Sequence, residues 1–312
     1  MGIIKNFLIG SSYLPALFIM PGTHTAPDLI RGTAKSHGTD LYYEIIGYGS
    51  PVIAVHGGPG LNHRYFLPHL ESMAKNHKLI LFDMRACGDS GGVLGSTITE
   101  KLLLDDLDSI RTSLNLDKVT LLGHSFGGLL AAHYAEIFPG KVKALILVDP
   151  LPPVKSAYDT LESNFKKRLT DRDNIYLAEI SSSEDFKSHK ASAIEALEKI
   201  IFSTYLYDKN LISKIDLSGS EATAFNFLTY YAQINNSIDY DYIQNNLLSI
   251  SARTLIIHGD YDPLPYQMVQ QMSGKIPDSK FVLFHNCGHV PFVEVPELFS
   301  RSVTEFLAET YK

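Results

Sequence analysis

The sequence has no tryptophan and only two cysteines, Cys87 and Cys287, among its 312 residues. Two cysteines cannot build a disulfide framework, and a chain of this length can bury enough apolar surface to fold without one. We therefore expect both to be small buried thiols. No CxxC or HExxH spacing occurs, so we expect neither a metal nor another cofactor.

Clustered positive charge is also scarce. The formal net charge is −7, and the longest basic run is Lys166-Lys167-Arg168, which suits the end or the surface of a helix. Nucleic-acid binding needs many phosphate contacts from Lys and Arg, so this class of function is excluded. Partners are then expected among small molecules or short peptides.

A long hydrophobic run is missing except near the N-terminus, where Phe7 to Met20 is apolar. This stretch is shorter than the ~20 residues that a membrane-spanning helix needs. With Lys5 before it, the stretch suits a secretory signal peptide, although Ala26 is followed by Pro27 and no A-x-A cleavage site stands out. We assign residues 1–30 to this segment and favour export to the periplasm or outside the cell. The alternative is an amphipathic extension or a membrane-surface anchor on a cytoplasmic protein.

From about residue 40 the chain alternates short β-branched and aliphatic runs with segments of helical period. A helix capped by Thr97, with Glu100 completing a capping box, should run to about Leu114, and others should span Ser125 to Ile137 and Pro296 to the C-terminus. This order predicts an α/β fold with a mostly parallel sheet and helices on both faces. The predicted strands are Leu41–Ile46, Val52–His56, Leu79–Asp83, Val119–Gly123, Ala144–Asp149, Thr254–Gly259 and Phe281–His285.

The alternation stops between residues 151 and 250, after Pro150, Pro152 and Pro153. This part is polar, helical in period and poor in strand character. We interpret it as a helical cap inserted over the carboxyl ends of the strands, where ligands bind in open α/β sheets. The core is then formed by residues 31–150 and 251–312.

The segment Gly123-His124-Ser125-Phe126-Gly127 contains a G-x-S-x-G pattern between a predicted strand and a predicted helix. That setting is typical of a nucleophile elbow, in which the turn strains the serine backbone and leaves no room for side chains at the glycines. The helix that follows favours developing negative charge at its N-terminus. Ser125 is therefore the candidate nucleophile.

A serine needs a base to take its proton, and the base needs an orienting carboxylate. In this arrangement the order along the chain is serine, acid, histidine. His289 follows the last predicted strand and is the candidate base, whereas His285 falls within the strand pattern and is expected to be packed. Asp262 is the preferred acid. Asp260 is expected to hold the turn by an Asx-type hydrogen bond, and Asp149 remains an alternative acid.

An oxyanion formed on the substrate needs N–H donors. One candidate is the backbone N–H of Phe126, next to the nucleophile. The other is Gly58, in the loop His56-Gly-Gly-Pro-Gly60, where glycines let bare backbone approach a substrate oxygen. The loop lacks the Lys-Ser/Thr ending of a phosphate-binding loop, which disfavours nucleotide binding.

These motifs resemble the α/β-hydrolase superfamily over residues 40–312, and within it the prolyl aminopeptidase (proline iminopeptidase) branch. The resemblance rests on His56-Gly-Gly-Pro-Gly60, Asp83-Met-Arg-Ala-Cys-Gly-Asp-Ser90, Gly123-His-Ser-Phe-Gly-Gly128, Gly259-Asp-Tyr-Asp262 and Gly288-His289. It supports Asp262 as the acid and implies release of an N-terminal residue, often proline, through an acyl-enzyme. Ala86 stands where that branch usually has glycine.

The branch's acidic and aromatic motifs for the substrate's free amine have no clear match in residues 151–250. Glu221, Tyr230 and Tyr231 are candidate stand-ins for substrate binding, although a solvated helix face is the favoured interpretation of these residues. A carboxylesterase or other small-acyl hydrolase with the same residues is the second functional hypothesis. A non-catalytic ligand-binding protein of the same fold is the third.

Overall fold

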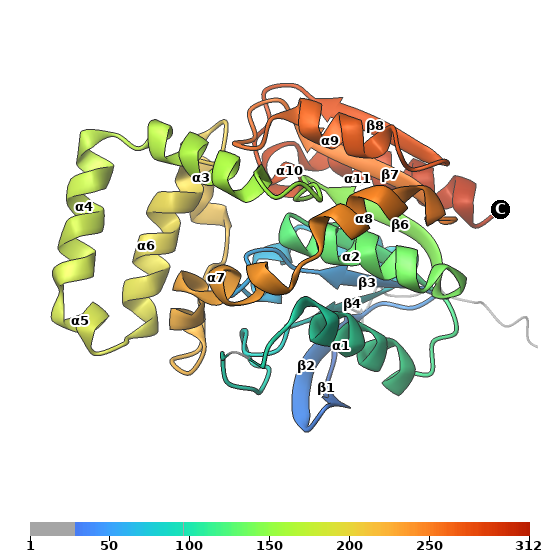
Figure 1. Ribbon diagram of the computed structural model, residues 1–312, viewed down its shortest axis with the longest axis horizontal. Helices are drawn as coiled ribbons and strands as arrows, with labels where there is room; N and C mark the ends of the chain where they lie inside the picture. The colour runs from blue at the N-terminus through green and yellow to red at the C-terminus, as the bar shows by residue number, and fades with distance from the viewer. Residues whose placement is uncertain (1–28, 96) are drawn as a thin grey trace, which may run out of the picture.

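One mixed sheet organises the part of the chain that the computed structural model describes, residues 29–95 and 97–312 (Figure 1). Within these residues eight strands lie in the order β1-β2-β4-β3-β5-β6-β7-β8. β2 pairs antiparallel with β1 and β4, and the other neighbouring pairs are parallel. The strands are β1 (Leu29–Ser36), β2 (Thr39–Ile46), β3 (Ser50–Val55), β4 (His77–Phe82), β5 (Val119–His124), β6 (Val142–Val148), β7 (Arg253–Gly259) and β8 (Ser279–Phe284).

The strands predicted from apolar runs are all present, with ends that differ by no more than two residues. β5 is buried along its whole length, as expected for a strand covered on both faces. β1 is an additional strand at the edge of the sheet. Most of its residues are exposed or half-exposed, with Ala34 and Ser36 buried, so it lacks the apolar run by which the other strands are detected.

Helices cover the sheet on both faces. α2 packs against β3, β5 and β6 and also against α1, whereas α11 packs against β6 and β7. The helical elements outside residues 151–250 are α1 (Glu100–Ser113), α2 (Phe126–Ile137), α9 (Tyr266–Ser273), α10 (Pro291–Glu294), α11 (Pro296–Thr310) and the 3₁₀ turns η1 (His63–Phe66), η2 (Glu71–Lys75) and η3 (Pro139–Lys141). The fold is therefore the layered α/β arrangement that the sequence predicts.

The start of α1 differs from the prediction. The N-cap is Thr99 rather than Thr97, and the Thr99 hydroxyl accepts a hydrogen bond from the Leu102 N–H. With Thr99 as the N-cap, Glu100 is the first residue of the helix rather than the third, so it cannot complete a capping box. Its carboxylate is instead paired with Nδ1 of His133 on α2. The Glu100 side chain, which the sequence pattern assigns to the helix cap, thus joins α1 to α2.

Residues 151–250 connect β6 to β7, and we call them the helical insertion. α4, α5 and α6 project away from the sheet, whereas α8 packs against α2 (Figure 1). None of the residues of α4 is buried. The insertion contains α3 (Ala157–Arg168), α4 (Asp171–Ser182), α5 (Glu184–Lys187), α6 (Ala191–Ser203), η4 (Lys209–Lys214), η5 (Ala224–Leu228), α7 (Tyr230–Ile234), η6 (Asn235–Ser237), α8 (Tyr240–Asn246) and η7 (Leu247–Ser249).

The proposed signal peptide or anchor falls in residues 1–28, outside the described residues, and β1 crosses the boundary assigned after residue 30. Within the described residues, no helix combines the length and the apolar character that a membrane span requires. Cys87 and Cys287 are free and buried, as predicted. Burial raises the pKa of both thiols above the usual range.

The carboxyl ends of the parallel strands hold the candidate site residues. The loop after β3 carries Gly58, and Ser125 stands between β5 and α2. Asp262 follows β7, and His289 follows β8. Because parallel strands point in one direction, these four loops meet at one edge of the sheet.

Candidate active site

Ser125 occupies a strained turn between β5 and α2. Its backbone angles are φ 55° and ψ −122°, and it is the N-cap residue of α2. A Cβ atom at Gly123 would lie 2.4 Å from the Gly127 carbonyl oxygen, and one at Gly127 would lie 2.2 Å from the Val55 carbonyl oxygen. Both distances are too short for any side chain, so the two glycines are required for the turn. The strain and the half-buried position at a helix N-terminus, in the wall of a pocket, match the sequence-based expectation of a nucleophile elbow for this segment.

His289 and Asp262 form a buried pair. Nδ1 of His289 lies 2.6 Å from Oδ2 of Asp262, and the other carboxylate oxygen, Oδ1, accepts a hydrogen bond from the Leu264 N–H at 2.7 Å. Burial acts to raise the pKa of Asp262, but His289 and the hydrogen bonds hold it below the usual range. An ionised carboxylate only accepts hydrogen bonds, so Nδ1 carries the ring proton and Nε2 of the neutral ring is free to accept one.

The glycine loop after β3 is fixed at both ends. Gly58 has φ +116°, a left-handed conformation that favours glycine. Nε2 of His56 accepts a hydrogen bond from the Met84 N–H at 3.0 Å. Gly60 lies so close to the helical insertion that an added Cβ would stand 2.5 Å from Cα of Phe227. The loop and the insertion therefore meet backbone to backbone.

A buried chain of hydrogen bonds joins this loop to the segment that carries His289. The Gly57 N–H donates to the hydroxyl of Tyr65 at 2.7 Å, and that hydroxyl lies 2.8 Å from Nδ1 of His124. Nε2 of His124 lies 2.7 Å from the carbonyl oxygen of His289. Burial lowers the pKa of His124 to about 3, so its ring is neutral. Nε2 then donates to the carbonyl, and Nδ1 accepts from Tyr65.

Ser125, Phe126, Gly58 and His289 line one pocket with a cavity of about 50 Å³. One water needs ~10–15 Å³ on this measure, so the cavity admits a small group. Its wall is mostly aromatic and aliphatic, and among the described residues that line it there is no Asp or Glu. Beyond the four site residues, the wall includes Leu61, Leu151, Tyr158, Leu161, Phe202, Tyr205, Phe227 and Tyr231.

The structure separates the three candidates for substrate binding. Tyr231 lines the pocket, and its ring stacks on Tyr158 with centroids 3.5 Å apart. Tyr230 is fully buried, and its hydroxyl donates to the carbonyl oxygen of Arg85. Glu221 is exposed and accepts a hydrogen bond from the N–H of Ala191. Neither tyrosine therefore lies on a solvated helix face.

Two expectations about the neighbouring side chains are wrong. The Asx-type hydrogen bond predicted for Asp260 is made by Asp262, to the Leu264 N–H. The carboxylate of Asp260 instead lies 2.9 Å from Nδ1 of His285. His285 is not packed, because β8 ends at Phe284 and the histidine side chain is 77% exposed.

Asp149, the alternative acid, is buried behind Asp262. Its Oδ1 accepts a hydrogen bond from the Gly259 N–H at 2.9 Å. Asp149, His258 and Asp262 bring ligand-type atoms within 4.8 Å of one another. Structural metal sites usually supply four ligands. Here Oδ2 of Asp262 is already paired with His289, and Nε2 of His258 lies 3.0 Å from the Leu264 carbonyl oxygen.

Comparison with known proteins identifies the family to which the sequence belongs. Residues 50–296 match the family model described as alpha/beta hydrolase fold. The chain belongs to the alpha/beta hydrolase fold family. This α/β-hydrolase is 29% identical over 266 residues to a proline iminopeptidase of Heyndrickxia coagulans, covering 84% of this chain and 91% of that protein. It is 29% identical over 292 residues to a proline iminopeptidase of Lactobacillus helveticus, covering 90% and 98%.

A solved structure shows the same fold. The crystal structure of proline iminopeptidase from Mycobacterium smegmatis aligns with a TM-score of 0.65 and 19% identity, covering 90% of this chain and 98% of the other. Ala86 of this α/β-hydrolase lies between β4 and α1. It adopts φ 57°, which favours glycine, and its carbonyl oxygen accepts a hydrogen bond from Nδ2 of Asn226 in the insertion.

Sequence reasoning missed three residues that fix this α/β-hydrolase's site. Tyr65 and His124 join the glycine loop to the His289 segment. Glu294 accepts hydrogen bonds from the N–H groups of Gly288 and Tyr207. His124 lies inside the G-x-S-x-G segment and was the only one of the three with a local signal. The contacts of Tyr65 and Glu294 reach 59 and 87 positions along the chain.

Proposed function

We propose that this α/β-hydrolase is a serine hydrolase with Ser125 as nucleophile, His289 as base and Asp262 as the acid that orients it. One observation carries the proposal. Ser125 and His289 line the same pocket, and Nδ1 of His289 is held by the ionised Asp262 carboxylate. Nε2 is thereby left as the proton acceptor on a residue that faces the serine's pocket.

In the proposed reaction the Ser125 hydroxyl attacks a substrate carbonyl carbon while Nε2 of His289 takes its proton. The N–H groups of Gly58 and Phe126 stabilise the oxyanion, and each such donor is typically worth ~10²–10³ in rate. The tetrahedral intermediate collapses, and His289 protonates the leaving amine or alcohol. Water then attacks the acyl-enzyme, with the same residue acting first as base and then as acid.

The substrate proposed first is a short peptide with an N-terminal proline, which the enzyme would release as an aminopeptidase. The support comes from relatives that are named proline iminopeptidases and match most of this chain. The pocket is small and rich in aromatic rings. A prolyl ring fits such a wall by its apolar surface, and its ammonium group is attracted to aromatic faces.

A second candidate is a carboxylesterase that acts on a small apolar acyl group. The observation in its favour is that, within the described part of the chain, no Asp or Glu lines the pocket. A free α-ammonium group would have no carboxylate partner there. An uncharged ester has no such requirement.

A substrate panel separates the two candidates. Proline anilide, other aminoacyl anilides, their N-blocked forms and short acyl esters are assayed with the full chain. Faster cleavage of free proline anilide supports the aminopeptidase, and cleavage of blocked substrates or esters alone contradicts it. Fluorophosphonate labelling must be abolished by Ser125→Ala and retained by Ser72→Ala, a change at an exposed serine. Absence of labelling in the folded wild type contradicts the serine hydrolase itself.

The rate should depend on pH, because His289 accepts a proton only when its ring is neutral. We expect kcat/KM and the labelling rate to fall as the pH is lowered from about 8 to about 5, because a protonated ring cannot take the Ser125 proton. A rate that stays flat across this range contradicts His289 as the base. Circular dichroism at each pH checks that the chain remains folded.

A further inference from the structure

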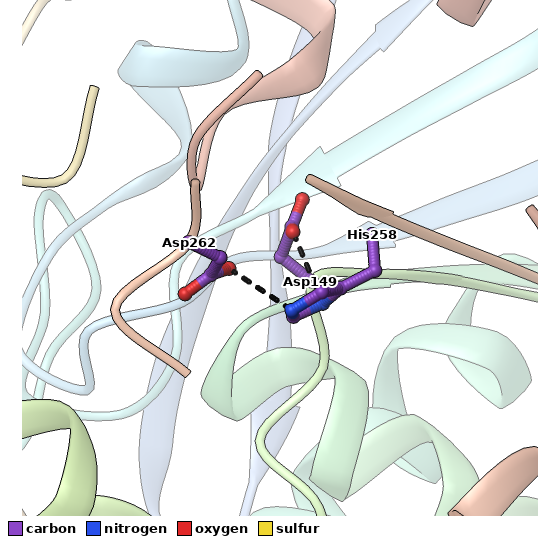
Figure 2. A group of neighbouring side chains, drawn as sticks. All are labelled: Asp149, His258 and Asp262. Carbon is purple, nitrogen blue, oxygen red and sulfur yellow. Dashed lines mark ion pairs between the residues drawn. The ribbon is translucent and has the colours of Figure 1, made fainter. Parts of the chain in front are cut away.

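A second carboxyl group and a second histidine lie beside Asp262 (Figure 2). Asp149 follows β6, His258 belongs to β7, and Asp262 lies in the loop after β7. Asp149 and His258 are fully buried, and Asp262 is 6% exposed. None of the proposed catalytic steps uses Asp149 or His258, so their burial beside the acid needs an explanation.

The hydrogen bonds of His258 fix its tautomer. Nε2 lies 3.0 Å from the carbonyl oxygen of Leu264, which can only accept, so Nε2 carries the proton. Burial lowers the pKa of His258, which keeps the ring neutral. Nδ1 is then an unprotonated acceptor, and it lies 3.2 Å from Oδ1 of Asp149 (Figure 2).

Asp149 is poorly placed to be an ionised carboxylate. Its Oδ1 accepts one hydrogen bond, from the Gly259 N–H, and within the described residues its Oδ2 has no hydrogen-bond partner. An ionised Asp149 would present an acceptor oxygen to the acceptor Nδ1 of His258 and a second negative charge to Asp262. Burial and the charge of Asp262 both raise the pKa of Asp149 well above its usual range.

We propose that Asp149 carries a proton at neutral pH, beside the unprotonated Nδ1 of His258, so that it adds no second negative charge to that of Asp262 next to His289. Asp149 is then a positioning residue. Its carboxylic acid group interacts favourably with the Asp262 carboxylate and stabilises that charge, and this limits how strongly the carboxylate draws a proton onto His289. The inference rests on the proposed roles of Asp262 and His289.

Polar groups from several neighbouring elements also act on these residues, among them the buried thiol of Cys287, whose pKa Asp149 raises. His124 at the end of β5 contacts the His289 backbone through Nε2, and the Tyr205 ring meets the His289 ring edge to face. Arg168 of α3 reaches the Asp262 carbonyl oxygen at 3.5 Å. Glu294 of α10 binds the N–H of Gly288. Asp149 is the member of this set that faces Asp262 with a carboxyl group lacking a full complement of hydrogen bonds.

The test compares Asp149→Asn with Asp149→Leu, using Asp260→Asn as the matched control. The rate of fluorophosphonate labelling at Ser125 is measured against pH, which needs no knowledge of the substrate. Asn is neutral and keeps an N–H donor. We therefore expect the fall in labelling rate at low pH, the acid limb of the profile, to match that of the wild type. Leu cannot stabilise Asp262, so His289 is protonated up to higher pH. The acid limb should move up by about one pH unit, and below it the rate should fall about tenfold.

Three results would overturn the proposal. If Asp149 is ionised in the wild type, Asn removes a negative charge and the acid limb moves to lower pH. If Asp149 is only structural, both variants keep the wild-type pH profile. A metal ion that copurifies with the wild type and is lost in Asp149→Asn would mean that the cluster binds a cation rather than a proton.

A second measurement covers the case in which Asp149→Leu does not fold. The infrared carbonyl band of a protonated carboxyl group should be present at pH 7 in the wild type and in Asp260→Asn, and weaker in Asp149→Asn. Equal bands in all three proteins contradict a protonated Asp149. If the wild type is not labelled at Ser125, the proposed function fails, while the infrared band still reports on Asp149.

Discussion

At the scale of single residues, the hydroxyl of Tyr65 connects two parts of the site. It accepts from the Gly57 N–H and donates to Nδ1 of His124, whose other nitrogen holds the His289 backbone. Tyr65→Phe leaves the buried Gly57 N–H and His124 without this partner. We expect the free energy of unfolding to fall by about 1–3 kcal/mol. The rate of Ser125 labelling should fall as well, because the glycine loop and the base segment lose their common tether.

Tyr134→Phe is the matched control, because Tyr134 is equally buried and its hydroxyl donates to Asp108, outside the pocket. Chemical denaturation and labelling are measured on both variants. We expect both to lose stability and only Tyr65→Phe to lose reactivity. Equal labelling rates in the two variants would show that the Tyr65 hydroxyl serves stability alone.

Single residues could be predicted where their chemistry has a fixed order along the chain. Ser125, Asp262 and His289 follow strands in the order that the nucleophile elbow requires, and the structure brings their loops to one edge of the sheet. The shared position of Asp149 and His258 could not be predicted in this way. It depends on the pairing of β6 with β7, which no local pattern encodes.

At the scale of elements, α10 fastens the His289 loop through Glu294. Its carboxylate accepts from the N–H groups of Gly288 and Val290 through one oxygen and from that of Tyr207 in the insertion through the other. Glu294→Gln replaces one accepting oxygen with an amide group that cannot accept. We expect a loss of about 1–3 kcal/mol in unfolding free energy and a slower labelling of Ser125.

The control for this variant is Glu297→Gln, which changes an exposed carboxylate in the first turn of α11. It should leave both the denaturation midpoint and the labelling rate unchanged. A Glu294→Gln protein as stable and reactive as this control contradicts a fastening role.

The ends of helices and strands could be predicted where the local sequence signal agrees with the tertiary packing. α11 begins at the predicted Pro296, and α2 begins one residue after Ser125, which is its N-cap. β1 was missed because an edge strand needs few apolar residues, and its exposed positions carry Arg31 and Lys35. The N-cap of α1 lies two residues beyond the predicted Thr97, because Thr97 and Thr99 are chemically equal as caps and the local sequence does not distinguish them.

At the scale of the whole molecule, Glu136 makes stability depend on pH. It is buried in α2, and neither carboxylate oxygen has a hydrogen-bond partner within the described residues. Burial, and secondarily the charge of Glu100, raises its pKa from 4.5 to about 8. The folded-state value exceeds the unfolded one, so the unfolded chain gives up this proton first. The contribution is therefore intact below pH 4.5 and is lost as the pH rises to about 8.

Glu136→Gln should remove this dependence. We expect the variant to match the wild type near pH 4.5 and to exceed its unfolding free energy by about 2–4 kcal/mol above pH 8. Denaturant unfolding at several pH values, with Glu71→Gln as the exposed control, measures the difference. A stability difference that does not grow with pH contradicts a protonated Glu136.

The overall layers of the molecule could be predicted, because alternating strands and helices leave few possible topologies. The arrangement of the helical insertion could not. Tyr230 and Tyr231 are adjacent in sequence, yet one hydroxyl binds the Arg85 backbone and the other residue lines the pocket. Which of two neighbours faces the site depends on how the insertion packs onto the sheet, and helical period alone does not specify that.

The contact between Gly60 and Phe227 has a consequence for turnover. The glycine loop and the insertion touch backbone to backbone, with no flexible side chain between them to absorb movement. If the insertion lifts to admit a substrate, the loop that carries Gly58 loses its support on that side. Substrate entry, which needs the insertion raised, and oxyanion stabilisation, which needs the glycine loop supported, would then occur at different times. A molecule too bulky for the insertion to return to the glycine loop should bind as an inhibitor and dissociate without being hydrolysed.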